Sequence, residues 1–126
     1  MNIASLLILV FLGVTFVQSG YDKVMDWRAN VDWLREHFSK TFLAGMVPQA
    51  LFIILALELI AGVLCFAGVL EIWLYDSRIT GYYGAVFSCI TLILLLFGQR
   101  IAKDYEGAKT IAIYFIPAVL AVYWLS

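Results

Sequence analysis

One carboxyl group in this chain stands out by its surroundings. Glu58 is the only ionisable residue well inside a long apolar run. If that run crosses a membrane, the charge costs about 2.5–3.5 kcal/mol, so the residue normally faces a protein interior or a water-filled cavity. Glu58 is therefore either a structural group that sets helix register through a hydrogen bond, or a proton or ligand site, because burial favours the neutral form of a carboxyl.

The residues that share a helical face with Glu58 are mostly small. Ile54, Glu58, Ala61, Cys65 and Gly68 follow alternating steps of four and three, which is the spacing of one helix face. Small side chains let another helix approach closely. The sequence therefore predicts helix contacts at a set of small residues in this run and in the next: Ala61, Gly62, Cys65, Gly68, Gly84 and Ser88.

Two polar residues, Gln99 and Arg100, end the third apolar run. A stripe of small and weakly polar residues precedes them in the same run, and we interpret this stripe as a surface for helix packing. The alternative interpretation is that the end of the run at Gln99 and Arg100 contacts a quinone or a lipid headgroup. The intramembrane polar candidates are therefore Glu58, Gln99 and Arg100. The Glu58 carboxylate is expected to meet a donor from a neighbouring helix, for which the candidates are Gln99, Arg100, Lys23, Tyr114 and Thr91.

The other reactive side chains form no recognised catalytic or metal-binding pattern. The single histidine, His37, has no second ligand at suitable spacing on its apolar face, which favours a solvated or interfacial role. Cys65 and Cys89 lie in different apolar runs without a CxxC pair, so we expect reduced packing residues. We therefore assign no metal ligand, leave the catalytic residues unknown, and expect no catalysis by this chain alone.

The composition predicts which solvent surrounds these residues. Of the 126 residues, 64% are hydrophobic and 13% are charged, against roughly 45–50% and 25% in soluble domains. A soluble core of this size cannot hide so much apolar surface, whereas lipid is compatible with it. The net charge of -1, without any basic block, argues against nucleic acid as a partner.

Four apolar runs are long enough to cross a membrane as helices. We predict an all-α membrane protein with one domain over residues 1–126, a bundle of four transmembrane helices. The predicted spans are about 3–19, 46–70, 80–99 and 110–126. We expect an interfacial cluster at 71–76 and a polar loop at 100–109.

The first connection, residues 21–42, has the pattern of an amphipathic segment. Val31, Leu34 and Phe38 share one stripe, and charged residues fill the other faces. We predict one or two helices in the membrane interface, whose apolar stripe is buried against the bundle, against another subunit or in the lipid interface.

The basic residues predict an orientation. Four spans put both termini on one side, and the second connection carries only Arg78, whereas the first and third carry the other seven Lys and Arg residues. The positive-inside rule therefore predicts that these two connections are cytoplasmic and that both termini lie outside the cytoplasm.

Several short stretches resemble the DoxX-like family of small four-helix membrane proteins. They are Ser19-Gly20-Tyr21-Asp22-Lys23 at the end of the first run, Val47-Pro48, the Leu57–Leu64 stretch, and the Gly98–Ala108 stretch before the last run. The order of these stretches covers nearly the whole chain. The almost uncharged N-terminus departs from common members of the family.

The resemblance implies a four-helix bundle more firmly than any activity. Relatives include a membrane subunit of a thiosulfate:quinone oxidoreductase, so we expect an accessory or anchor subunit of a larger membrane complex, with quinone or lipid as the possible cofactor. The expected partners are membrane lipids and other membrane subunits, and the expected location is the bacterial inner membrane. Two alternatives stay open: a membrane subunit of a thiosulfate:quinone-type oxidoreductase, and a small transporter or lipid-handling protein.

Overall fold

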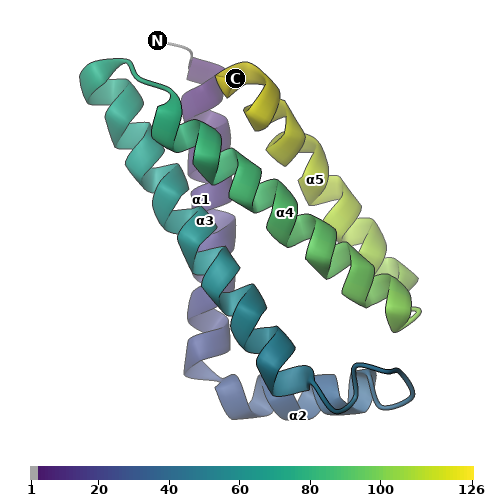
Figure 1. Cartoon of the computed structure of the whole chain (residues 1–126). Coiled ribbons are helices and arrows are strands. Elements are labelled where there is room, and N and C mark those ends of the chain that lie inside the picture. Colours follow the sequence, from purple (N-terminus) through teal and green to yellow (C-terminus); the bar gives the residue numbers. More distant parts are fainter. Residues whose placement is uncertain (1–2) are drawn as a thin grey trace.

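The computed structural model describes residues 3–126, and over this range it contains helices and no strand. The helices are α1 (Ile3–Met25), α2 (Trp27–His37), α3 (Val47–Tyr75), α4 (Ile79–Ile101) and α5 (Tyr105–Leu125). The four long helices form a bundle, and α2 lies across one end of it (Figure 1). The start of α1 and the end of α5 lie together at the other end (Figure 1). The predicted all-α four-helix bundle is confirmed.

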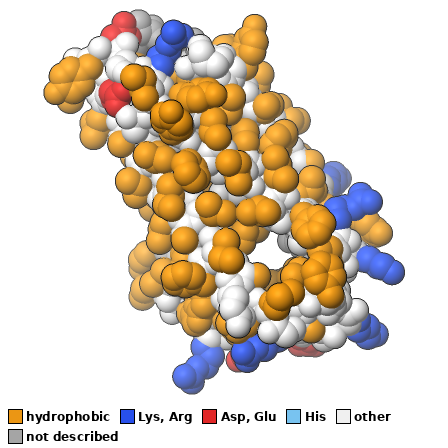
Figure 2. Space-filling model, in the orientation of Figure 1, with side chains coloured by type: hydrophobic (Ala, Val, Ile, Leu, Met, Phe, Trp, Pro, Cys, Tyr) orange, Lys and Arg blue, Asp and Glu red, His pale blue; other side chains and the backbone are white. Residues whose placement is uncertain are grey.

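The four long helices are long and apolar enough to cross a membrane. The shortest of them, α5, has 21 residues and is about 30 Å long. Large apolar side chains on the outer faces remain exposed, among them Leu7, Val63 and Ile113. Figure 2 shows apolar side chains over most of one face and charged side chains near its ends. Lipid is the solvent that such a surface requires.

Two helices extend beyond the predicted spans. α1 continues past residue 19 to Met25, and α3 continues past residue 70 to Tyr75, so the expected interfacial cluster at 71–76 is largely helical. Polar and aromatic residues are as compatible with helix as apolar ones, and they mark the depth of the membrane surface rather than the end of the helix.

The predicted loop at 100–109 is also wrong, because α5 already begins at Tyr105. The Asp104 side chain accepts a hydrogen bond of 2.9 Å from the backbone N–H of Gly107. This is an N-cap contact, and it lets a helix begin within a polar stretch. The connection between α4 and α5 is therefore a short turn.

Small residues bring α3 and α4 together near the turn that joins them. Gly68 lies against the backbone of Gly81, and a Cβ atom on Gly84 would lie 2.8 Å from the backbone nitrogen of Cys65. Such contacts are possible only without side chains at these positions.

The two helices diverge from this crossing toward α2 (Figure 1). Near α2 the facing residues are large, with Ile53 and Ile54 on α3 and Leu94 and Leu95 on α4. α2 covers the wide end of the resulting V, where Val31 packs against residues of α3. The shape of the bundle at this end therefore follows from the change from small to large side chains along α3 and α4.

Candidate functional site: a chamber beside a buried ion pair

The Glu58 side chain is buried on α3, with 1% of its surface exposed, and it forms an ion pair with Lys23 of α1. The Nζ atom of Lys23 lies 2.9 Å from Glu58 Oε1 and donates a hydrogen bond of 2.6 Å to Ser19 Oγ. Lys23 is one of the five donors that the sequence proposed. A buried charge is tolerated when an opposite charge stands beside it, so this pair explains how Glu58 is accommodated in the bundle.

The carboxylate is not saturated by this contact. Neither oxygen of Glu58 has an aligned hydrogen-bond partner among residues 3–126, so its interaction with Lys23 is a contact between charges. An ammonium group carries three N–H donors, and the bond to Ser19 uses one of them. The pair therefore retains hydrogen-bonding capacity on both sides.

A chamber of about 400 Å³ lies between α2, α3 and α4, and Lys23 lines it. The other polar side chains in its wall are Asn30 of α2 and Gln99 of α4. The remaining walls are mostly apolar and come from all three helices: Leu34, Phe38, Val47, Leu51, Ile54 and Leu95. Figure 2 shows an opening in the apolar surface in this region, above α2 and between α3 and α4.

The opening of the chamber is lateral, on the side of the bundle between α3 and α4 (Figure 2). Ile53 and Leu94, which line the chamber, are also exposed on the outer surface of the bundle. Gly98 lies in the wall, and a Cβ atom on it would meet only the Phe38 ring, at 3.8 Å. The chamber is thus an apolar space with a polar residue, Lys23, on the α1 side.

The apolar stripe of α2 forms the floor of this region. Val31 is buried with Val47 and Leu51, and Leu34 and Phe38 pack against the same cluster. The sequence allowed three environments for this stripe: the bundle, another subunit or the lipid interface. The structure shows the stripe packed against the bundle. The stripe therefore fixes the position of α2 across the wide end of the V.

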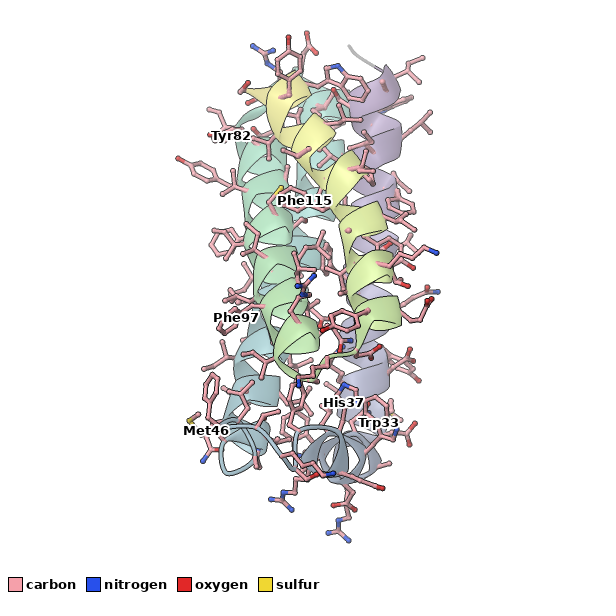
Figure 3. All side chains as sticks on the ribbon, turned by 90° about the vertical axis from the view of Figure 1, so that its right-hand side faces the viewer. Trp33, His37, Met46, Tyr82, Phe97 and Phe115 are labelled. Atoms are coloured by element: carbon pink, nitrogen blue, oxygen red, sulfur yellow. The ribbon has the colours of Figure 1, made fainter. Side chains whose placement is uncertain are left out.

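A second set of contacts, around His37, joins α2 to the turn between α4 and α5. The His37 Nε2 atom lies 3.3 Å from Gln99 Oε1 and 3.7 Å from Asp104 Oδ2. Its ring stacks on Trp33 with 4.6 Å between centroids. Figure 3 shows Trp33 and His37 beside each other on α2, below the ends of α4 and α5.

The sequence predicted a solvated or interfacial role for His37 and did not predict these partners. His37 is part-buried rather than solvated. Its partner Gln99 lies 62 residues away in the chain, so only the fold brings the two side chains together. Over residues 3–126 no group of three potential metal-binding side chains forms around it or elsewhere.

None of the other candidate donors, which are Gln99, Arg100, Tyr114 and Thr91, forms a hydrogen bond or an ion pair with Glu58 in the described part of the chain. The amide of Gln99 faces His37 on one side and the start of α5 on the other, where a Cβ atom on Gly107 would lie 2.7 Å from its Nε2 atom. Arg100 is exposed, with its guanidinium 5.2 Å from the centre of the Tyr105 ring, so its position is at the end of α4 rather than inside the bundle.

The small residues named from the sequence lie at contacts between helices. Gly84 faces Cys65, and Gly62 faces Val17 of α1. Cys65 is fully buried, with its sulfur 3.7 Å from Ser88 Oγ, and the Ser88 hydroxyl donates to the backbone oxygen of Gly84. Both cysteines are free. Two further predicted packing residues, Ala61 and Gly68, are also buried.

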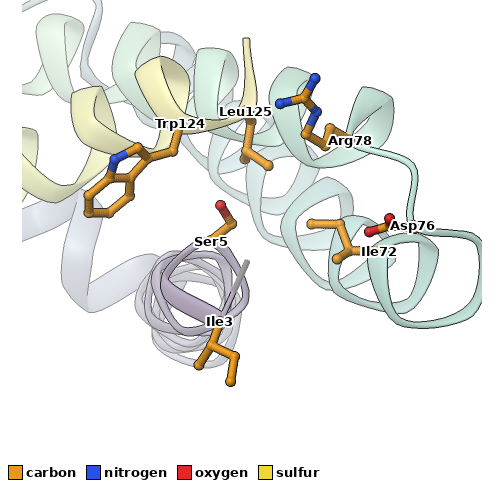
Figure 4. Close-up of a pocket in the computed structure, with 7 residues that line it drawn as sticks. All are labelled: Ile3, Ser5, Ile72, Asp76, Arg78, Trp124 and Leu125. Atoms are coloured by element: carbon orange, nitrogen blue, oxygen red, sulfur yellow. The ribbon is translucent and has the colours of Figure 1, made fainter. Parts of the chain in front are cut away.

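A larger hollow of about 650 Å³ lies at the opposite end of the bundle. Figure 4 shows its lining residues, which come from the ends of α1, α3 and α5 and from the turn before α4. Ile3 points away from the others in this view, and Arg78 comes from the turn (Figure 4). Its lining is more mixed than that of the chamber, because Ser5, Ile72 and Leu125 are buried whereas Asp76 and Arg78 are exposed.

Taken with the apolar helices, these contacts define a small integral membrane protein built as a four-helix bundle, with one ion pair inside it and an apolar chamber at one end. No family model, no curated protein and no solved structure matches the chain. The resemblance to the DoxX-like family therefore stays a prediction.

Proposed function

We propose that this protein binds a lipid-soluble molecule, with an apolar tail and a small polar head, in the chamber between α2, α3 and α4. The observation that supports this most directly is the composition of the chamber wall. It is apolar over most of its area, and its few polar side chains include Lys23 and Asn30. Ligand sites of this size combine apolar walls with a few placed polar groups.

The position of the chamber supports the same proposal. It lies at the end of the bundle covered by the amphipathic helix α2, where a membrane changes from hydrocarbon to headgroups. Exposed apolar residues border its opening, so an amphiphile in the bilayer reaches it without crossing water. Quinones and lipids both have this combination of tail and head.

A broader role is supported by the small size of the chain and by the four apolar helices that make up most of it. We propose that the protein acts as a membrane subunit that holds such a molecule for a larger complex in the bacterial inner membrane, with both termini outside the cytoplasm. A stoichiometric partner that copurifies in mild detergent would support the accessory role, and turnover by the isolated protein would contradict it.

Gly98→Leu tests the chamber itself. Gly98 has free space on its chamber side, so leucine fits locally and fills part of the site. Native mass spectrometry in mild detergent, with an added monoacylglycerol or short-tailed quinone, is expected to show a bound molecule in the unaltered protein. Gly98→Leu should reduce occupancy at least about tenfold, which corresponds to about 1.4 kcal/mol of binding free energy.

Two controls separate filling of the chamber from other effects. Gly98→Ala adds one methyl group and should keep most of the binding. Gly45→Leu introduces the same side chain at an exposed site with no atom within 4 Å and should bind like the unaltered protein. The proposal is wrong if neither probe binds stoichiometrically, or if Gly98→Leu binds as well as Gly45→Leu.

A further inference from the structure

The polar side of the chamber has a charge balance that determines which head it accepts. Lys23 is the only cationic residue in the chamber wall among the described residues. Its ammonium is already 2.9 Å from the Glu58 carboxylate, which is itself buried. The pair is therefore neutral as a unit, although it still presents N–H donors.

An anionic head placed against Lys23 would also come close to Glu58, which lies behind the chamber wall, 2.9 Å from the same ammonium. Two like charges near each other in a low-dielectric interior repel strongly, and the protein offers no second cation in the wall to offset this. We infer that the chamber selects an uncharged head with a carbonyl acceptor and excludes anionic heads such as phosphates and carboxylates. This inference rests on the proposed binding function and specifies the ligand class of the same site.

Asn30 completes the recognition. Its Nδ2 atom donates 2.9 Å to the backbone oxygen of Asp26, which leaves the amide oxygen as an acceptor. Lys23 thus supplies donors and Asn30 an acceptor, both from the side of the chamber formed by α1 and α2. An uncharged head with a carbonyl and a hydroxyl matches both groups. Neutral glycerides have this chemistry, and so does a quinone together with its reduced form.

The test is a competition between two probes that share a tail and an ester and differ by one phosphate group. Monooleoylglycerol and oleoyl lysophosphatidic acid have the same tail and ester, and the second carries an added phosphate. Native mass spectrometry of the protein with an equimolar mixture measures their ratio directly. We expect the unaltered protein to favour the neutral probe by about tenfold, a ratio that like-charge repulsion in a protein interior is large enough to produce. A short-tailed benzoquinone as third competitor distinguishes a quinone from a glyceride as the better source of the carbonyl.

Glu58→Gln gives the decisive variant, because it removes the negative charge and keeps the size of the side chain. The Lys23 charge is then uncompensated, so preference should reverse toward the phosphate probe. Lys23→Met removes the N–H donors and leaves the Glu58 charge uncompensated, so it should weaken binding of both probes and keep the preference for the neutral one. An unaltered protein that favours the phosphate overturns the inference and leaves the proposed function intact, whereas binding of neither probe removes the proposed function itself.

A folding defect in Glu58→Gln does not prevent the test. The double variant Lys23→Met/Glu58→Gln removes both charges together and leaves no unpaired ion. Its expected behaviour is weak binding without the tenfold preference for the neutral probe. If the double variant keeps the preference of the unaltered protein, the ion pair does not select the head and the inference is wrong.

Discussion

Two alanine substitutions on the same helix are expected to change stability in opposite directions. Gly84 and Gly98 both lie within α4. Replacing glycine by alanine in a helix gains about 1 kcal/mol from backbone propensity at either site. At Gly98 the new methyl group meets only the Phe38 ring at 3.8 Å, an ordinary contact, so Gly98→Ala should keep that gain.

At Gly84 the methyl group would lie 2.8 Å from the Cys65 nitrogen, 3.0 Å from its sulfur and 3.0 Å from the Leu64 carbonyl carbon. Two of these atoms are backbone and cannot rotate away, so α3 and α4 must separate. Overpacking of this kind costs about 1–3 kcal/mol. The propensity term cancels between the two variants, and Gly84→Ala should therefore be about 1–3 kcal/mol less stable than Gly98→Ala.

The assay is unfolding of both purified variants in the same detergent, followed by helical circular dichroism through a titration with a denaturing detergent. The unaltered protein provides the common reference. Because lipid and detergent solvate apolar side chains, the difference reports packing at the helix crossing rather than hydrophobic burial. Equal stability of the two variants, or a more stable Gly84→Ala, would show that α3 and α4 do not approach closely through Gly84.

Further predictions concern the ion pair, orientation, cysteines and His37. Lys23→Met alone should destabilise the bundle by about 3–5 kcal/mol in the same titration, and adding Glu58→Gln should restore most of the loss, since a lone buried charge is the costly state. A reporter that works only in the cytoplasm, fused after Ser126, should stay silent; activity there would reverse the orientation. Cys65→Ala with Cys89→Ala should keep ligand binding and lose only packing stability, and loss of binding in a folded variant would instead give the free thiols a role. His37→Ala should make Trp33 more accessible to acrylamide quenching, because the contacts of His37 with Gln99 and Asp104 hold α2 in place; unchanged quenching would exclude that role.

The four spans could be predicted from the sequence because uncharged runs of this length rarely form anything other than membrane-spanning helices. Helix ends were harder, since the polar residues near the membrane surface continue α1 and α3 as helix. The start of α5 did have a local signal, as Asp104 stands three residues before Gly107 and caps the helix there. That signal was weaker than the polarity of the surrounding stretch, which favoured a loop.

For the candidate site, too, one part could be predicted from the sequence and another part could not. Glu58 is visible in the sequence because a lone charge in an apolar run has a high energetic cost. The chamber is not visible, because it depends on the angle at which α3 and α4 diverge and on α2 covering the gap. The contact of His37 with Gln99 likewise joins segments that no local pattern connects.

The choice of Lys23 as the partner of Glu58 follows from the register of α1 against α3. Gly20 lies against Leu59, and the two helices are antiparallel (Figure 1). Lys23 is three residues after Gly20 on α1, so the residue of α3 at the same level is near Ala56, three residues before Leu59. Helical side chains lean toward the N-terminus of their own helix, as the bond from Lys23 to Ser19 shows. The lysine therefore leans deeper into the bundle and the glutamate leans back toward α2, and the two charged groups meet between the levels of their backbones. The charge of Glu58 is thus nearer to the α2 end of the bundle than its position in the apolar run suggests, beside the chamber that Lys23 lines.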